Sequence, residues 1–270
     1  MSDWVALVFQ PFRPETRILA EECGIQLRVR GVESRLLAAT HLDAVPSARC
    51  RFALTCGGDG TVLRAAAWLV GSGVPIVPVR MGTLSFLGEL EPGEVLNALD
   101  PLLDGRFRTD ARRMLRVRHA GRDAIGLNEA VLGRGAASRA MRLDVYVDKQ
   151  PLGRYTADGM VAATPTGSTA YALAAGGPIM APWIPAFLLV PIAPHLTLLR
   201  ALVLPDSSTI RMVVHTVQPA VLTVDGHLDL PVADGEDVCV DRAEQSTVFG
   251  RLGPEAEFFR ALESRLARRG

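Results

Sequence analysis

Residues 51–79 read RFALTCGGDGTVLRAAAWLVGSGVPIVPV, and this stretch decides the fold of the amino-terminal half of the chain. The apolar run at 51–56 predicts a buried strand, and the glycines that follow it predict a tight turn. Residues 61–70 have helical spacing, and 76–79 form a second apolar strand after a glycine break. Because strand–helix–strand units form parallel sheets with crossover helices, the stretch predicts an α/β domain.

The residues on either side extend this pattern. An apolar run at 5–9 and an amphipathic segment at 14–23 predict a strand and a helix. A short apolar run around Leu27 and Val29 predicts the next strand. A further helix is predicted at 93–103, where it closes this half of the chain.

After about residue 110 the chain changes to short runs rich in Val, Leu, Thr and Tyr, which predict antiparallel strands. These runs are 114–117, 143–147, 160–163, 210–214 and 221–224. Helical spacing returns at 255–268, and we expect this last helix to pack back on the first domain. The predicted fold class is α/β plus all-β. It has a Rossmann-like α/β domain at 1–110, joined by 250–270, and a β-sandwich-like domain at 111–249.

Charge and lysine content exclude two classes of function. The 29 basic residues balance 29 acidic ones, so the basic excess of a nucleic-acid-binding protein is missing and small-molecule ligands are expected. Lys149 is the only lysine, and it follows Asp148. A Walker-type phosphate loop needs a lysine directly after its last glycine, so that kinase mechanism is excluded.

Residues 160–199 lack Asp, Glu, Lys and Arg and are long enough to cross a bilayer. Their prolines and the Gly176-Gly177 pair would break a spanning helix repeatedly, so we expect buried strands and turns and no membrane association. The four cysteines form no C-x-x-C pair, which argues against a zinc site or a disulfide scaffold. The amino terminus lacks the features of a secretory signal, and a cytoplasmic protein is expected.

The first candidate site is the loop Gly57-Gly58-Asp59-Gly60-Thr61, at the carboxyl edge of the predicted parallel sheet, where ligands bind. Its glycines let backbone amides approach a phosphate, and the next helix points its amino terminus at the same place. The carboxylate of Asp59 repels phosphates unless a magnesium ion or a substrate hydroxyl lies between them. A structural alternative makes Asp59 the N-cap of the helix.

The second candidate site is DGMVAATPTGSTAYALAAGGP at 158–178. Its side-chain hydroxyls can donate and accept hydrogen bonds with sugar hydroxyls and with the edges of amides or purines, and Tyr171 could stack on a base. Hydroxyls that bind their own backbone in a turn are the alternative.

The third candidate site is the polar pair Asn128-Glu129 in an apolar run. Two carboxylate oxygens of Glu129 suit a pair of ribose hydroxyls, and Asn128 offers a donor and an acceptor to a purine. A solvated strand end is the alternative.

The three motifs resemble those of the NAD kinase family, in which a glycine-aspartate loop, an Asn-Glu or Asn-Asp pair and the long hydroxyl-rich signature follow one another in the order found along this chain. Further family-like stretches lie at 81–87 (MGTLSFL), 113–115 (RML), 191–195 (PIAPH) and 224–227 (VDGH), so the resemblance covers about residues 52–227. It implies an amino-terminal α/β domain, a carboxyl-terminal all-β domain, and a nucleotide site in the cleft between them. The implied reaction transfers the ATP γ-phosphoryl group to the 2′-hydroxyl of the adenosine ribose of NAD and gives NADP and ADP.

The resemblance also implies roles for individual residues. Asp59 would be the catalytic base or positioning group, within a phosphate loop of Gly57, Gly58, Gly60 and Thr61. The implied NAD-binding residues are Asp59, Gly60, Arg64, Asn128, Glu129, Arg139, Asp158, Thr169, Ala170, Tyr171, Ala174 and His227. Of these, Asn128 and Glu129 would hold the adenosine part, Asp158 the nicotinamide half, and residues 169–171 the adenine pocket. Magnesium would be carried by the nucleotide, with ATP or polyphosphate as donor, and the family suggests a homodimer or homotetramer.

Four positions depart from the family pattern. Ser85 replaces a usual glycine, Ala174 a usual serine, Ala201 a usual proline, and His227 a frequent glutamine. Ala174 removes a hydroxyl that would be worth ~1 kcal/mol in ligand binding. Two rival functions follow: a lipid or sphingoid-base kinase, which shares the glycine loop, and a non-catalytic nucleotide sensor.

Overall fold

The computed structural model describes residues 3–42, 49–82, 85–135, 140–195, 200–254, 258–259 and 262–263. The chain divides into two compact units. The first comprises Met1–Ala111 and Ser246–Gly270, and the second comprises Arg112–Gln245.

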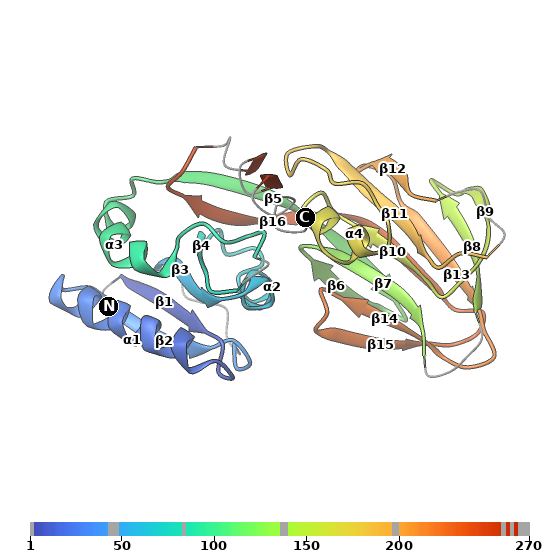
Figure 1. Cartoon of the computed structure of the whole chain (residues 1–270). Helices are drawn as coiled ribbons and strands as arrows, with labels where there is room; N and C mark the ends of the chain where they lie inside the picture. Colours follow the sequence, from blue (N-terminus) through green and yellow to red (C-terminus); the bar gives the residue numbers. More distant parts are fainter. Residues whose placement is uncertain are drawn as a thin grey trace. The chain divides into compact units, whose positions relative to one another are not determined.

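The first unit is built on a parallel sheet in the order β2-β1-β3-β4 (Figure 1). Its strands are β1 (Trp4–Phe9), β2 (Glu33–Ala38), β3 (Cys50–Gly57) and β4 (Ile76–Arg80). The helices are α1 (Pro14–Val29), α2 (Asp59–Trp68) and α3 (Val95–Leu103), with a 3₁₀ turn, η1 (Pro92–Glu94), before α3. The predicted α/β class is confirmed for this unit.

The predicted strand around Leu27 and Val29 is wrong, because these residues form the last turns of α1. Leu19, Cys23 and Leu27 follow one another at intervals of four and are all buried, so their spacing continues one helical face. The second strand begins only at Glu33.

Successive side chains of each strand point to opposite faces of the sheet, and different helices cover the two faces. Phe52, Leu54 and Cys56 of β3 pack in one cluster with buried residues of α1 and α3. Helix α2 contacts β3 and β4 but contributes no residue to that cluster. The carboxyl ends of β1, β3 and β4 therefore meet at one edge of a sheet covered by helices, which is where ligands bind in such folds.

The second unit is a sandwich of antiparallel sheets, as predicted (Figure 1). One sheet has the order β12-β11-β10-β7-β14-β15, and the facing strands are β16-β13-β8-β9 with β5 and β6. Their bounds are β5 (Arg108–His119), β6 (Arg122–Gly126), β7 (Glu129–Arg134), β8 (Met141–Val147), β9 (Gln150–Ala157), β10 (Gly159–Ala163), β11 (Ala186–Ile192), β12 (Leu202–Pro205), β13 (Ile210–His215), β14 (Ala220–Val224), β15 (Leu228–Val232) and β16 (Asp237–Arg251). All five strand runs predicted for this half lie within these strands.

Residues from both sheets form the core of the sandwich, with Leu132, Phe187 and Val224 on one side and Leu143 and Met212 on the other. The outer face of the six-stranded sheet is covered by a short 3₁₀ turn, η2 (Gly167–Thr169), and a helix, α4 (Tyr171–Ala174). The hydroxyl-rich part of the second motif lies in these two elements and in the turn that directly follows β10.

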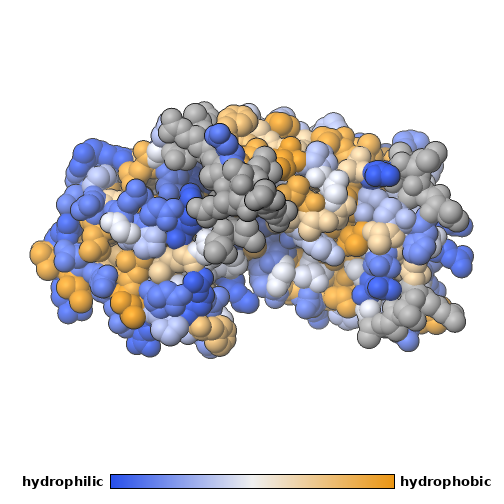
Figure 2. All heavy atoms as spheres, viewed as in Figure 1, coloured by the Kyte–Doolittle hydropathy of each residue, from blue (hydrophilic) through white to orange (hydrophobic). Residues whose placement is uncertain are grey.

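Residues 160–195 contain strands, turns and the one-turn helix α4, as the prolines predicted. No helix in the described parts of the chain is both long enough and apolar enough to span a bilayer. Hydrophobic side chains gather over β11 and the edge strand β12 (Figure 2). Val203 on β12 is exposed, as are Trp183 and Ile184 in the turn before β11.

Most of the predicted helix at 255–268 lies outside the described residues. The described positions 258–259 and 262–263 are helical.

Candidate active site

The glycine loop joins β3 to α2 in the first unit. Gly57 ends β3, Gly58 is the N-cap of α2, and Asp59 is the first residue of the helix. The alternative with Asp59 as N-cap is therefore wrong, and no side chain caps this end. The N–H of Thr61 donates to Gly58 O, and the amino terminus of the helix favours an anionic acceptor at the same place.

The three glycines of the loop have different surroundings. A Cβ atom on Gly57 would overlap the side chain of Thr61, which is buried beneath it. A Cβ atom on Gly58 or Gly60 would meet no described atom within 4 Å, and neither residue has a positive φ. Steric contact with Thr61 thus explains why position 57 is a glycine. At positions 58 and 60 no such contact exists among the described residues, and there is open space beside the backbone.

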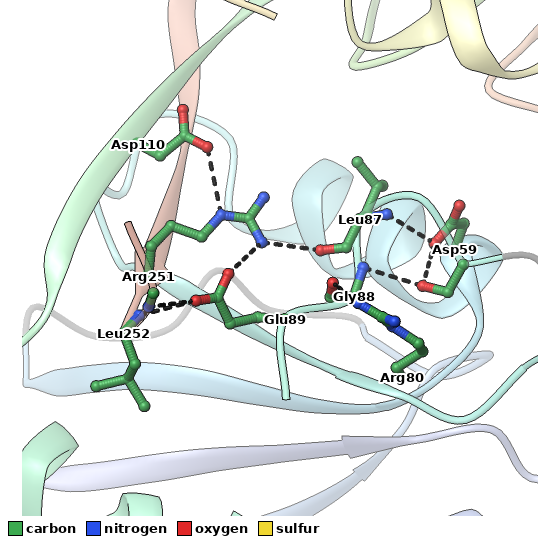
Figure 3. Close-up of polar contacts among 10 residues, drawn as sticks. Asp59, Arg80, Leu87, Gly88, Glu89, Asp110, Arg251 and Leu252 are labelled. Carbon is green, nitrogen blue, oxygen red and sulfur yellow. Dashed lines mark hydrogen bonds and ion pairs between the residues drawn. The ribbon is translucent and has the colours of Figure 1, made fainter. Parts of the chain in front are cut away.

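The carboxylate of Asp59 is held by the loop that follows β4. Ser85 Oγ donates a hydrogen bond to Asp59 Oδ1 over 2.7 Å. The backbone N–H of Phe86 donates to Oδ2 over 2.8 Å. The backbone N–H of Leu87 donates to Oδ1 over 3.2 Å (Figure 3). Half-buried Asp59 therefore has a fixed orientation before any ligand binds.

A second polar cluster lies in the second unit, at the start of β7. Asn128 and Glu129 are 5% and 7% exposed, so the solvated-strand-end alternative is wrong. Asn128 Oδ1 and Glu129 Oε2 are buried and make no hydrogen bond within the described chain. Because a buried polar atom without a partner costs free energy, both atoms are poised to receive a donor from a ligand.

Asp225 organises this cluster from the end of β14. Its carboxylate accepts hydrogen bonds from the N–H groups of Leu127, Asn128 and Glu129, over 2.6, 2.8 and 3.0 Å. Burial raises the pKa of Asp225 despite these donors. Burial, and then the charge of Asp225, raise the pKa of Glu129 to about 8, against a lowering by the N–H of Tyr171, which donates to it.

The hydroxyl-rich motif folds over this cluster, and three of its hydroxyls bind backbone carbonyls. Thr164 Oγ1 donates to Leu127 O, Ser168 Oγ to Pro165 O, and Thr169 Oγ1 to Thr166 O. A Cβ atom on Gly167 would overlap the carbonyl of Asn128, so only glycine allows this approach. The alternative that turn hydroxyls satisfy their own backbone therefore applies to Ser168 and Thr169, whereas Thr164 binds a carbonyl 37 residues away.

The other predicted NAD-binding residues are placed as follows. Ala170 is the N-cap of α4, Tyr171 is 44% exposed, and Ala174 is exposed. His227 is exposed in the turn after Asp225, with Nδ1 3.2 Å from Asp225 O. Half-buried Arg64 lies on α2, one turn beyond the glycine loop, and Arg139 lies outside the described residues.

Asp158 lies apart from the second polar cluster. It precedes β10, whereas Thr164 follows that strand, so the two are separated by ~20 Å along the chain. Arg134 Nη2 lies 3.3 Å from Asp158 Oδ2. Asp158 would therefore contact a different part of a ligand from Asn128 and Glu129.

Three site features were not identified from the sequence. Ser85 was recognised only as a departure from a family pattern, and Asp225 only as part of a motif. Arg13 gave no signal. The Nη1 atom of Arg13 donates a hydrogen bond to Met81 O. A Cβ atom added to the neighbouring Gly82 would lie 3.9 Å from this Nη1 and 3.8 Å from Gly58 Cα. This arginine therefore places positive charge close to the glycine loop.

Comparison with known proteins identifies the family. Residues 7–107 match the ATP-NAD kinase N-terminal domain, and residues 127–252 match the ATP-NAD kinase C-terminal domain. The NAD kinase of Chloroflexus aggregans is 37% identical over 99% of this chain and 100% of its own length. The chain belongs to the ATP-NAD kinase family.

Two further proteins are similar to nearly the whole of this chain. The NAD kinase of Dehalococcoides mccartyi strain CBDB1 is 32% identical over 97% of this chain and 95% of its own length. The crystal structure of yeast NADH kinase complexed with NADH has a TM-score of 0.85 at 25% identity, and the match covers 99% of this chain and 88% of that one. The match to the N-terminal domain includes the glycine loop, and the match to the C-terminal domain includes the Asn128-Glu129 cluster.

Proposed function

We infer that this chain is an NAD kinase that transfers the γ-phosphoryl group of ATP to the 2′-hydroxyl of the adenosine ribose of NAD, giving NADP and ADP. The observation that carries this inference is the similarity to NAD kinases along nearly the whole chain. The two polar clusters support it, since one pairs a carboxylate with a glycine loop and the other presents unbonded buried oxygens.

Asp59 is the proposed catalytic residue. An ionised carboxylate has about four lone-pair sites, and three donors already occupy three of them. The remaining site on Oδ2 is available to a substrate hydroxyl. Asp59 would orient the 2′-hydroxyl and accept its proton as that oxygen attacks the γ-phosphorus.

Asn128 and Glu129 would bind the adenosine part of NAD. A ribose hydroxyl or an adenine amino group supplies the donors that Asn128 Oδ1 and Glu129 Oε2 lack. Exposed Tyr171 would stack on the adenine, beside Thr169, Ala170 and Ala174. Gly60, Arg64, Arg139 and His227 complete the proposed NAD contacts, with Asp158 at the nicotinamide half.

Gly57, Gly58, Gly60 and Thr61 would form the phosphate loop. Open space beside Gly58 and Gly60 allows phosphate oxygens to approach the amides at the start of α2. Among the described residues, no group of three or more His, Cys, Asp or Glu side chains is placed to hold a metal ion. Magnesium would arrive on the nucleotide, where it would neutralise phosphate charge. ATP or polyphosphate would be the donor.

Domain limits, assembly and compartment are also proposals. We propose domains at 1–110 with 250–270 and at 111–249, in keeping with the two compact units. We also propose a homodimer or homotetramer, because Val203 on the edge strand β12 is exposed, as are Trp183 and Ile184 in the turn before β11. Light scattering after gel filtration tests this assembly. The free thiols of Cys23, Cys50, Cys56 and Cys239 fit a reducing cytoplasm.

The deciding experiment measures NADP formation by a coupled dehydrogenase, using the purified chain and its Asp59→Asn variant with NAD or NADH and magnesium-ATP or polyphosphate. We expect turnover to fall by on the order of several hundred-fold in the variant, with NAD affinity retained. Near-normal turnover in the variant would exclude the role of Asp59. Failure of the unmodified chain with every substrate pair would favour a nucleotide sensor, and phosphorylation of a lipid extract would favour a lipid kinase.

A further inference from the structure

The segment 85–89 connects Asp59 to a buried arginine from the other end of the sequence. At one end of the segment, Ser85 Oγ donates to Asp59 Oδ1 and accepts a hydrogen bond from the N–H of Gly88 over 2.9 Å. This second bond closes a tight turn, since a Cβ atom on Gly88 would lie 2.7 Å from Ser85 Oγ. The hydroxyl is thus oriented by its own loop before it reaches Asp59.

At its other end, the segment is held by Arg251, near the end of β16 (Figure 3). Arg251 Nη1 donates to Leu87 O over 2.9 Å, and the N–H of the same leucine donates to Asp59 Oδ1. The carbonyl and the amide of one residue therefore link the arginine to the carboxylate.

The guanidinium of Arg251 is itself fixed from several directions. Nη1 lies 3.1 Å from Glu89 Oε2, Nε lies 3.3 Å from Asp110 Oδ2, and the group lies over the Phe249 ring at 4.7 Å. The other oxygen of Glu89 accepts hydrogen bonds from the N–H groups of Leu252 and Gly253 over 2.9 and 2.8 Å. Figure 3 shows Asp110 and Glu89 converging on the arginine.

Stability alone is a poor explanation for this arrangement. Removing an arginine and two carboxylates from water costs free energy that their attraction only partly offsets, and apolar residues of equal volume would serve as well. What a planar guanidinium adds is direction, because its donors are rigid and can bind a carboxylate and a carbonyl together. Such rigidity matters where a reacting group must be held within a fraction of an ångström.

We propose that Ser85 and Arg251 are positioning residues that hold the carboxylate of Asp59 in its productive orientation, Ser85 directly and Arg251 through Leu87. This rests on the proposed function of Asp59. A glycine at position 85 would lack the hydroxyl, so in this chain the serine adds a third donor to the two backbone amides.

Double-mutant cycles test the proposal. Ser85→Ala and Arg251→Lys are each combined with Asp59→Asn, and kcat and KM are measured for NAD and ATP. With Asp59 present, each single variant should lower kcat by at least five-fold and change either KM by less than two-fold. In the Asp59→Asn background, where there is no carboxylate to position, the same changes should lower the residual kcat by less than two-fold.

Two control variants in the same unit carry matched contacts away from Asp59. Ser72 Oγ donates to Leu69 O over 2.8 Å and accepts from the N–H of Val74 over 3.2 Å. Arg30 makes a two-pronged ion pair with Asp100 over 2.6 and 3.1 Å. Ser72→Ala and Arg30→Lys should leave kcat unchanged, whatever they do to the melting temperature.

The possible outcomes separate the two claims. Near-normal turnover in Asp59→Asn alone overturns the proposed function of Asp59 and this inference with it. A large loss in Asp59→Asn, with Ser85 and Arg251 effects that multiply onto it, leaves the function standing and shows that both residues are merely structural. If Arg251→Lys does not fold, the Ser85 cycle decides, because Ser85→Ala removes a single hydroxyl.

Discussion

Replacing Glu129 with Gln should change how the stability of the ligand-free chain depends on pH. In the folded chain, burial and the neighbouring Asp225 raise the pKa of Glu129 from 4.5 to about 8. The unfolded chain releases this proton at the lower pH, so rising pH favours the unfolded state until the folded chain ionises as well. The stability that neutral Glu129 contributes is complete below pH 4.5 and is lost as the pH rises through about 8.

The size of the effect follows from the width of this window. One pKa unit corresponds to about 1.36 kcal/mol, so between pH 5 and pH 9 the folded chain loses on the order of 4 kcal/mol through this carboxyl group. Glutamine has nearly the same shape and cannot ionise. The free energy of unfolding of Glu129→Gln, minus that of the unmodified chain, should therefore grow by about this amount across the range.

Urea unfolding followed by circular dichroism at pH 5, 7 and 9 measures the difference, and other titrating groups cancel because both proteins contain them. Glu21→Gln, at an exposed position on α1, is the matched control and should give a curve parallel to that of the unmodified chain. Parallel curves for Glu129→Gln as well would refute the reasoning, since Glu129 would then ionise alike in the folded and unfolded chains.

Four further substitutions test the glycine loop and the ligand contacts. Gly57→Ala should lower the free energy of unfolding by ~2 kcal/mol or more, because the added methyl group overlaps buried Thr61. Gly60→Ala, at a helical position with open space beside it, should leave this free energy unchanged or raise it by up to ~1 kcal/mol, and equal losses in urea unfolding would contradict this. Ala174→Ser should lower the KM for NAD about five-fold if the restored hydroxyl donates to the ligand, and an unchanged KM would show that position 174 is not a contact. Arg13→Ala should raise the KM for ATP by about five-fold with the melting temperature nearly unchanged, and a rise only in the KM for NAD would exclude a contact with the phosphoryl donor.

The spacing of apolar residues predicted the secondary structure wherever a segment clearly followed either the helical or the strand period. The strand–turn–helix unit around the glycine loop was recognised because apolar runs and glycines mark its limits directly. The strand expected at Leu27 and Val29 failed because a two-residue apolar run fits either period, and the buried spacing from Leu19 to Leu27 belongs to a helix. Expectations for Arg139, and for most of the helix at 255–268, fall on residues outside the described structure.

The candidate site was only partly predictable, since its residue types are visible in the sequence but their partners are not. Asp59 and Asn128-Glu129 could be selected by chemistry alone. The contacts that fix them join residues far apart in the sequence, with a separation of 98 from Leu127 to Asp225 and of 164 from Leu87 to Arg251. No spacing rule reaches that far, so one sequence cannot distinguish these partners from ordinary surface charges.

The same hydrogen-bonding arrangement occurs in both units, but it has a different effect in each. In each, an aspartate carboxylate accepts hydrogen bonds from consecutive backbone amides: Asp59 from residues 86 and 87, and Asp225 from residues 127 to 129. Asp225 is buried, and its carboxylate oxygens accept hydrogen bonds from backbone amides of the chain itself. Its effect is therefore to fix the backbone that carries Asn128 and Glu129. Asp59 is only half-buried, and its third donor is a side-chain hydroxyl rather than an amide. Solvent access therefore distinguishes the carboxylate that can meet a substrate from the one that only holds a loop, although their hydrogen bonds look alike.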